Sequence, residues 1–228
     1  MTALTPTPSG APTRRATVVI AGDDVYEDLF GIVSTLQALL VAEGFAAKVA
    51  MGLGRFASAA PATDDLVVIC SGVGEFTREA QRGLTARVTA GLGAIFIHAT
   101  AVLDEQDDAE AIALVGARYE SHGPHPHESR FRVLLDPAHP ITAGIAPFDI
   151  EHEHYRLAVA PGTSPLAWRA AGDGPEPLLL AREVGAGRVC YLQLGHDSRA
   201  FAEPEVANLF GRAARWASST TPEMRRSA

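Results

Sequence analysis

Two histidines in this sequence stand directly after runs of apolar residues. His98 lies near the end of GAIFIHAT, and His196 follows RVCYLQLG and is followed at once by Asp197. An imidazole at such a place can act as a general base, bind a metal ion or donate a hydrogen bond to a substrate oxygen. In α/β hydrolases, a turn like the one that holds His98 often carries a serine or cysteine nucleophile. A histidine bonded only to neighbouring backbone is the alternative, and the sequence leaves it open.

A second group of reactive side chains lies in FDIEHEHYRL, which contains His152, Glu153, His154 and Tyr155. Neighbouring side chains of an extended chain point to opposite sides, so Glu153 and Tyr155 share one side and the two histidines share the other. Glu153 is therefore a candidate general acid or base. Tyr155 is a candidate for binding substrate. A polar edge strand without a function is the alternative.

A third group is the loop ESHGPHPHES, with His122, His125 and His127. Short histidine-rich tracts can bind zinc or nickel through neutral imidazoles. The loop lacks cysteine and the chain has no HExxH helix, so a solvated surface loop is the competing interpretation. We expect one histidine, with His125 as the candidate, to reach a binding cleft, rather than all three to form a closed metal site.

The elements that position these groups follow from the spacing of apolar residues. In the first half, strand-like runs alternate with helical patterns; the runs cover 16–22, 46–52, 64–72 and 93–99, and the helical patterns cover 28–45 and 77–91. Repeats of strand, helix and strand at this spacing predict an α/β fold. We expect three layers, with a mostly parallel sheet and helices on both faces, as in flavodoxin-like proteins.

The second half is less regular. RFRVLL reads as a strand before a proline-rich turn, and the glycines of EVGAGR join two apolar runs in a hairpin-like arrangement. A closing helix begins at Pro204, a suitable first-turn proline. We expect a single domain over 16–217, with disordered tails at 1–15 and 218–228.

The carboxyl ends of the predicted strands indicate where a ligand would bind, because open parallel sheets hold their ligands there. Four segments directly follow predicted strands and can line one cleft; they are 21–24, 70–76, 97–100 and 195–197. Their convergence adds Asp23, Asp24 and Thr100 to the candidate substrate-binding residues.

Composition narrows the class of partner. The chain is 47% hydrophobic and 20% charged, with a formal net charge of −8, which argues against a nucleic-acid partner. Its two cysteines, Cys70 and Cys190, lie in apolar runs and are expected to be buried. No apolar run approaches the roughly 18 residues of a membrane span, and the first residues do not form a signal peptide. We expect a cytoplasmic protein with a small-molecule ligand, and a homodimer is one option for its assembly.

Three stretches together resemble the ThuA-like (trehalose utilisation) family of the class I glutamine amidotransferase-like superfamily. They are GAIFIHAT, DPAHPITAGIAPFDIEHEHYRL and REVGAGRVCYLQLGHDSRAFAEPEVANLFGRAARWA. With DDLVVICSG, the resemblance extends from Ala16 to Ala217. It implies the class I glutamine amidotransferase-like fold and a role in the catabolism of disaccharides, including oxidised keto sugars.

The sequence departs from that superfamily at the reacting centre. Amidotransferases carry a cysteine where this chain has His98, and the acid after their late histidine comes two places on, whereas Asp197 follows His196 directly. The histidine that often follows the first strand of the family is absent, which leaves Asp23 or Asp24 as substitutes. We therefore expect no thiol-based amide hydrolysis.

Three functions remain open. The first is a carbohydrate-active hydrolase or lyase, in which His98, His196 and Glu153 surround a polyol and perform acid–base chemistry. Asp197 would orient His196 in this scheme, although neighbouring strand side chains diverge, so another partner can take that part. The second is a non-catalytic binding or interaction domain. The third is a divalent-metal site built from His98, His196 and one loop histidine, with His125 the candidate; no other cofactor is expected.

Overall fold

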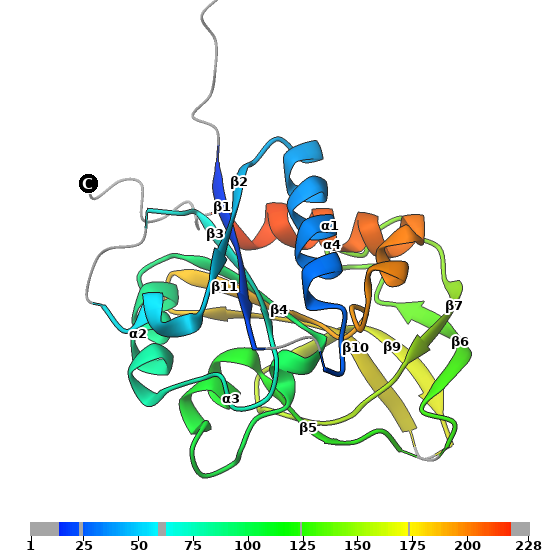
Figure 1. Ribbon diagram of the computed structural model, residues 1–228. Helices are drawn as coiled ribbons and strands as arrows, with labels where there is room; N and C mark the ends of the chain where they lie inside the picture. Colours follow the sequence, from blue (N-terminus) through cyan, green and yellow to red (C-terminus); the bar gives the residue numbers. More distant parts are fainter. Residues whose placement is uncertain (1–13, 23–24, 59–62, 124, 173, 220–228) are drawn as a thin grey trace, which may run out of the picture.

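The computed structural model describes residues 14–22, 25–58, 63–123, 125–172 and 174–219. Its main sheet has nine strands among the described residues, in the order β2-β1-β3-β4-β11-β10-β9-β6-β7 (Figure 1). In that order the strands are Ala46–Met51, Arg15–Ala21, Leu66–Ser71, Gly93–Ile97, Gly187–Leu192, Gly174–Val184, Ser164–Ala171, Glu128–Leu135 and Phe148–Glu153. A separate pair joins β5 (Ala117–Ser121) to β8 (Arg156–Val159).

One half of the main sheet is parallel. The strands β2, β1, β3, β4 and β11 run in the same direction, in the strand order of flavodoxin-like folds. Every residue of β3 and β4 is buried, as expected for parallel strands covered on both faces. The apolar runs predicted for these strands are therefore confirmed.

The other half is antiparallel because β10 and β11 form a hairpin, as EVGAGR predicted. Gly185 turns the chain with a φ of 60°, and a Cβ there would come within 2.6 Å of the Thr89 carbonyl oxygen. Beyond the hairpin, β9, β6 and β7 continue the sheet in antiparallel pairs. The α/β class is confirmed, and the sheet is mixed: the predicted parallel arrangement holds for β2, β1, β3, β4 and β11.

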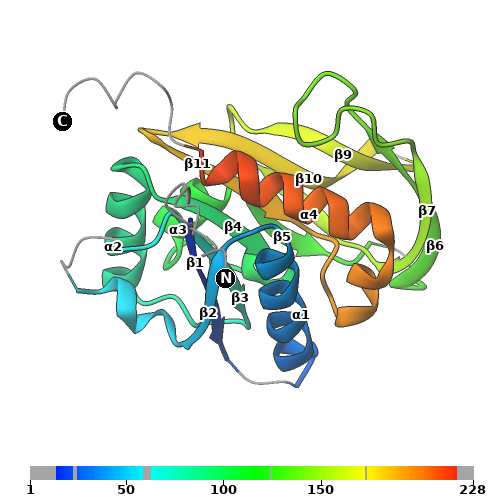
Figure 2. The same ribbon diagram turned by 90° about the horizontal axis from the view of Figure 1, so that it is seen from above.

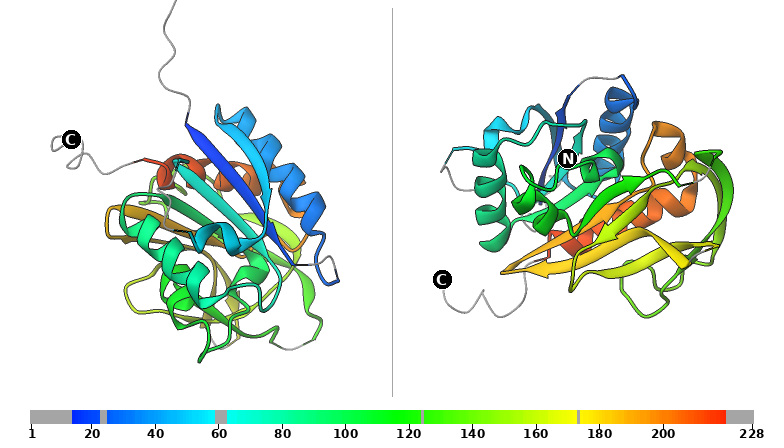
Figure 3. Two further views of the ribbon diagram at one scale, coloured as in Figure 1. Left: turned by 60° about the vertical axis from the view of Figure 1, so that its left-hand side comes forward. Right: turned by 90° about the horizontal axis from the view of Figure 1, so that it is seen from below.

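Two hydrophobic cores lie on opposite faces of the parallel half. Val18 and Ile20 of β1 belong to one core with residues of α1 (Leu29–Ala42) and α4 (Pro204–Ala217). Figure 2 shows these two helices together on one face of the sheet. Val19 and Ala21 point to the other face, toward α2 (Arg78–Thr89) and α3 (Ala109–Val115). Figure 3 shows the helices and the twisted sheet from two further directions. By packing both faces of the parallel strands, the two cores hold the carboxyl ends of these strands together at one edge of the sheet.

The cysteines belong to these strands. Cys70 lies in β3 and Cys190 in β11, and both are buried, as predicted. Burial raises the pKa of both thiols far above the usual value.

The predicted tails lie mostly outside the described residues. Arg15 opens β1, while Ser218 and Ser219 directly follow α4. No helix in the described part of the chain is both long and apolar enough to cross a membrane.

Candidate functional site

The turn after β4 holds His98 in an uncommon backbone conformation. Its φ is 42°, in the left-handed region that residues other than glycine rarely adopt. The Tyr191 hydroxyl donates a hydrogen bond to the His98 carbonyl at 2.9 Å and supports the turn. The imidazole is buried, and its Nδ1 lies 2.6 Å from the carbonyl oxygen of Gln193. Because a carbonyl only accepts, Nδ1 carries a proton and Nε2 faces outward.

Three imidazoles meet the carboxylate of Glu153 at the end of β7. His98 Nε2 lies 2.8 Å and His196 Nδ1 lies 3.2 Å from Oε2, while His122 Nε2 lies 3.0 Å from Oε1. The histidines come from three separate segments, after β4, β11 and β5. The ends of two parallel strands, of β7 and of β5 thus bring four reactive side chains together, and we call Glu153, His98, His122 and His196 the Glu153 cluster.

The charges in the cluster are coupled. Burial by itself raises the pKa of Glu153, but the contacts with His196 and His98 outweigh burial and hold this pKa well below its usual range. The contact with Glu153 raises the pKa of His196. Burial lowers the pKa of His98, although Glu153 opposes that effect. Glu153 is accordingly a carboxylate near neutral pH.

His152 supports the cluster through hydrogen bonds to the backbone of the segments that carry His196 and Glu153. Its Nε2 accepts hydrogen bonds from the backbone N–H groups of Gly195 at 3.1 Å and His196 at 3.2 Å, and its Nδ1 donates to the Glu153 carbonyl. Burial lowers the pKa of His152 to about 3, so the ring is neutral and its Nε2 can accept. The sequence places His152 in the same segment as Glu153 but does not indicate that its side chain binds the backbone of a distant turn.

Two tyrosines position the imidazoles. Tyr155, a predicted site residue, is buried and lies against the His98 ring with centroids 4.2 Å apart. The Tyr119 hydroxyl lies 2.7 Å from His122 Nδ1, and if it donates there, His122 Nε2–H points at Glu153. Tyr119 was not predicted, since nothing in its local sequence links it to the other groups.

Other predicted residues have different surroundings. The buried Thr100 hydroxyl lies 2.6 Å from the Ile97 carbonyl and 3.1 Å from the Ile69 carbonyl of β3, so it bonds to backbone of its own segment and of the neighbouring strand. His125 is exposed and stacks on His127 at 3.9 Å, so the loop histidine that reaches the cluster is His122. Asp23 and Asp24 lie outside the described residues.

Asp197 does not pair with His196. Its carboxylate accepts from the Arg199 backbone N–H at 2.8 Å and binds the Arg199 guanidinium at 2.6 Å. The Arg199 hydrogen bonds lower the pKa of Asp197, although burial opposes them. The part of orienting His196 falls instead to Glu153, because its carboxylate contacts the imidazole directly.

An open cavity of about 380 Å³ adjoins the cluster. Glu153, His152 and His196 form part of its wall, and most of the other lining residues are charged or polar. The charged ones are Glu128, Arg130, Asp149, Glu151, Asp197, Arg199 and Glu203. A cavity of this kind offers hydrogen-bond partners to a small ligand rich in hydroxyl groups.

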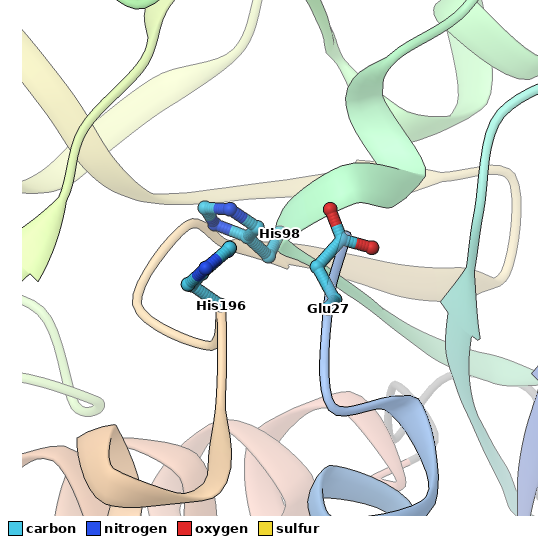
Figure 4. A group of neighbouring side chains, drawn as sticks. All are labelled: Glu27, His98 and His196. Atoms are coloured by element: carbon cyan, nitrogen blue, oxygen red, sulfur yellow. The ribbon is translucent and has the colours of Figure 1, made fainter. Parts of the chain in front are cut away.

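Glu27 approaches the cluster from the segment before α1. Its carboxylate, His98 and His196 each offer a ligand atom, and these atoms all lie within 4.8 Å of one another (Figure 4). The spacing after the first strand favours Asp23 and Asp24 from this segment and does not indicate Glu27. The acidic run after the first strand was the available signal, but spacing does not tell which acid reaches the edge.

The comparisons with known proteins fit this fold. A family model described as trehalose utilisation, ThuA, matches residues 20–217. The chain belongs to the ThuA family. The resemblance seen in the sequence is thereby confirmed, together with the class I glutamine amidotransferase-like fold.

Solved structures of ThuA-like proteins share the architecture. A putative ThuA-like protein from Parabacteroides merdae has a TM-score of 0.75 at 16% identity, covering 91% of each chain. One from Bacteroides uniformis has a TM-score of 0.75 at 14% identity, covering 95% of this chain and 96% of that chain. A β-galactosidase from Rahnella matches over 87% of this chain but only 31% of its own, at 16% identity and a TM-score of 0.62. No curated protein is similar enough in sequence to match.

Proposed function

We propose that this protein is an enzyme of carbohydrate utilisation that performs acid–base chemistry on a disaccharide or keto sugar. The observation that carries the proposal is the Glu153 carboxylate, which three imidazoles contact beside an open, polar cavity. Membership of a family described as trehalose utilisation supports the class of substrate.

In this proposal Glu153 is the proton acceptor. An ionised carboxylate held by imidazoles can take a proton from a carbon beside a keto group, or from a water that attacks a glycosidic carbon. The imidazoles fix the direction of its lone pairs, and the charged cavity wall binds substrate hydroxyls. The proton acceptor then stands at a defined place relative to the bound sugar.

The proposal excludes a thiol nucleophile. The turn that carries a cysteine in amidotransferases carries His98 here, and the thiols of Cys70 and Cys190 are buried inside strands with raised pKa values. A buried thiol with a raised pKa forms little thiolate, which is the nucleophilic form.

The test is turnover of unmodified and 3-keto disaccharides by wild type and by Glu153→Gln. We expect turnover of at least one substrate class and a loss of about 10²–10⁴-fold in kcat/KM, the usual contribution of a positioned proton acceptor. Glu79→Gln on the exposed face of α2 is the matched control and keeps wild-type rates. Equal rates in wild type and Glu153→Gln would overturn the assignment, and sugar binding without turnover would favour a non-catalytic binding protein.

A further inference from the structure

We propose that Glu27, His98 and His196 bind a divalent transition-metal ion of the zinc class. The inference rests on the proposed function, because it places a cofactor beside Glu153, which contacts both histidines. One carboxylate oxygen and one nitrogen from each imidazole lie within 4.8 Å of one another, and Figure 4 shows the three side chains gathered between separate segments.

His98 is oriented as a metal ligand. Its Nδ1–H donates to the Gln193 carbonyl at 2.6 Å, which leaves the Nε2 lone pair directed into the cluster. Metal-binding histidines usually donate their second ring N–H to a backbone carbonyl or carboxylate in this way. The bond fixes both the tautomer and the direction of the ring.

A positive charge is needed beside His98 Nε2. In the neutral ring, the Nε2 lone pair would face the Glu153 carboxylate at 2.8 Å, which is repulsive without a proton or a cation between them. A second ring proton would place a charge on a fully buried imidazole, which is costly. A metal ion supplies the charge without doubly protonating the ring.

The Nδ1 atom of His196 points to the same conclusion. It is buried and lies 3.2 Å from Glu153 Oε2, but the contact lacks hydrogen-bond alignment, and Nδ1 has no hydrogen-bond partner among the described residues. His152 meanwhile holds the backbone of this turn by accepting from the His196 N–H. A buried polar atom without a partner is costly, and a metal–nitrogen bond would remove that cost.

Two imidazoles and one carboxylate are a typical ligand set for catalytic zinc, which keeps a fourth position open. Tetrahedral ligands at the usual zinc distances lie about 3.4 Å apart, so the present spacing of up to 4.8 Å would have to close toward that value when the ion binds. Glu153 Oε2 lies 2.8 Å from His98 Nε2 and 3.2 Å from His196 Nδ1, so a molecule bound to the ion could give a proton to this carboxylate.

Metal binding to chelator-treated protein tests the inference without any sugar. Zn²⁺ is titrated by calorimetry and Co²⁺ by its absorption bands, with wild type, Glu27→Gln, His196→Asn and His125→Asn. We expect one Zn²⁺ per chain in wild type and tetrahedral Co²⁺ bands. Loss of a ligand in Glu27→Gln or His196→Asn should weaken binding by at least the roughly 10–100-fold that loss of a supporting residue costs. The exposed His125→Asn is the matched control and keeps wild-type affinity.

Several results would overturn the inference. They are no Zn²⁺ binding by wild type, unchanged affinity in both Glu27→Gln and His196→Asn, equal weakening in His125→Asn, or binding of Mg²⁺ but not Zn²⁺. The two proposals fail separately. Sugar turnover by a protein that binds no Zn²⁺ removes the metal site and leaves the proposed function, whereas one bound Zn²⁺ without turnover of any sugar does the reverse.

Discussion

Two carboxylates of this protein, Glu153 and Glu176, are surrounded by basic side chains in very different ways. Glu153 meets three imidazoles beside an open cavity. Glu176 is buried and binds the guanidinium of Arg169, which in turn contacts His154. Since Glu153 and His154 are neighbours in the sequence, adjacent residues of one segment serve two clusters.

The Glu176 cluster is built across two paired strands. Arg169 of β9 stands directly opposite Glu176 of β10, and its Nε donates to Oε2 at 2.6 Å. Arg169 Nη2 lies 3.0 Å from His154 Nδ1, and the guanidinium lies over the Phe131 ring at 5.4 Å. The Nε and Nη2 groups of this arginine therefore both have side-chain partners.

The two carboxylates differ in whether their basic partners can give up a proton. A guanidinium keeps its proton at any ordinary pH, so Glu176 is permanently paired and cannot exchange protons with a ligand. Imidazoles can lose their protons or exchange them for a metal, and Glu153 lies at a cavity wall. The first cluster stabilises the antiparallel half of the sheet, and the second can react.

The largest effect on stability is expected from Arg169→Met. The substitution leaves Glu176 buried without its main partner, and breaking a buried ion pair costs about 3–5 kcal/mol. The free energy of unfolding from urea denaturation measures it. Arg132→Met, which removes an exposed pair with Asp149, is the control and should change stability by no more than about 1 kcal/mol. Equal effects of the two substitutions would remove the structural part assigned to the Glu176 cluster.

A smaller loss is expected from His152→Ala. It leaves the N–H groups of Gly195 and His196 without their acceptor, which costs about 1–3 kcal/mol. Since the same turn carries His196, kcat should also fall. His152→Gln offers an amide oxygen as acceptor and should recover part of both losses. If His152→Ala lowers stability but leaves kcat unchanged, His152 supports the fold without positioning the site.

The smallest effect is a dependence of stability on pH that comes from His154. Burial and then the charge of Arg169 lower the pKa of His154 below the value it has when unfolded, while Glu176 and the carbonyls of His122 and Pro126 oppose the shift. The unfolded chain therefore binds more protons below about pH 6.5, and stability falls as the pH decreases through that range. His154→Asn should flatten this slope between pH 7.5 and 5.5, and an unchanged slope would contradict the account.

The sequence predicted the parallel half of the sheet and the residues at its edge for one physical reason. An apolar run that ends abruptly at His98 or Gly195 marks both a buried strand and the point where its chain leaves the sheet. Alternation along an extended segment placed Glu153 and Tyr155 on one side, and both contact His98. Strand ends and the facing of side chains depend on residues close together in the sequence, so the spacing of apolar and polar residues predicts them.

What the sequence could not supply depends on contacts between distant segments. The pairing of β10 with β9, and of β9 with β6, turned the expected parallel sheet into a mixed one. The choice of His122 over His125 depends on how one loop folds against Glu153, and the choice of Glu27 depends on where α1 begins. Alternation along a strand argues against direct pairing of Asp197 with His196, but only the fold shows that a turn brings Arg199 to the Asp197 carboxylate.

The most direct test of the account measures kcat/KM and the free energy of unfolding together for Glu153→Gln and Glu176→Gln. The account predicts different outcomes in the protein that remains folded: Glu153→Gln loses about 10²–10⁴-fold in kcat/KM. Glu176→Gln loses about 3 kcal/mol of stability while the remaining folded protein keeps its rate. If Glu153→Gln instead destabilises the fold as much as Glu176→Gln and leaves the rate of the folded protein unchanged, Glu153 is a structural residue and the proposed reacting centre is wrong.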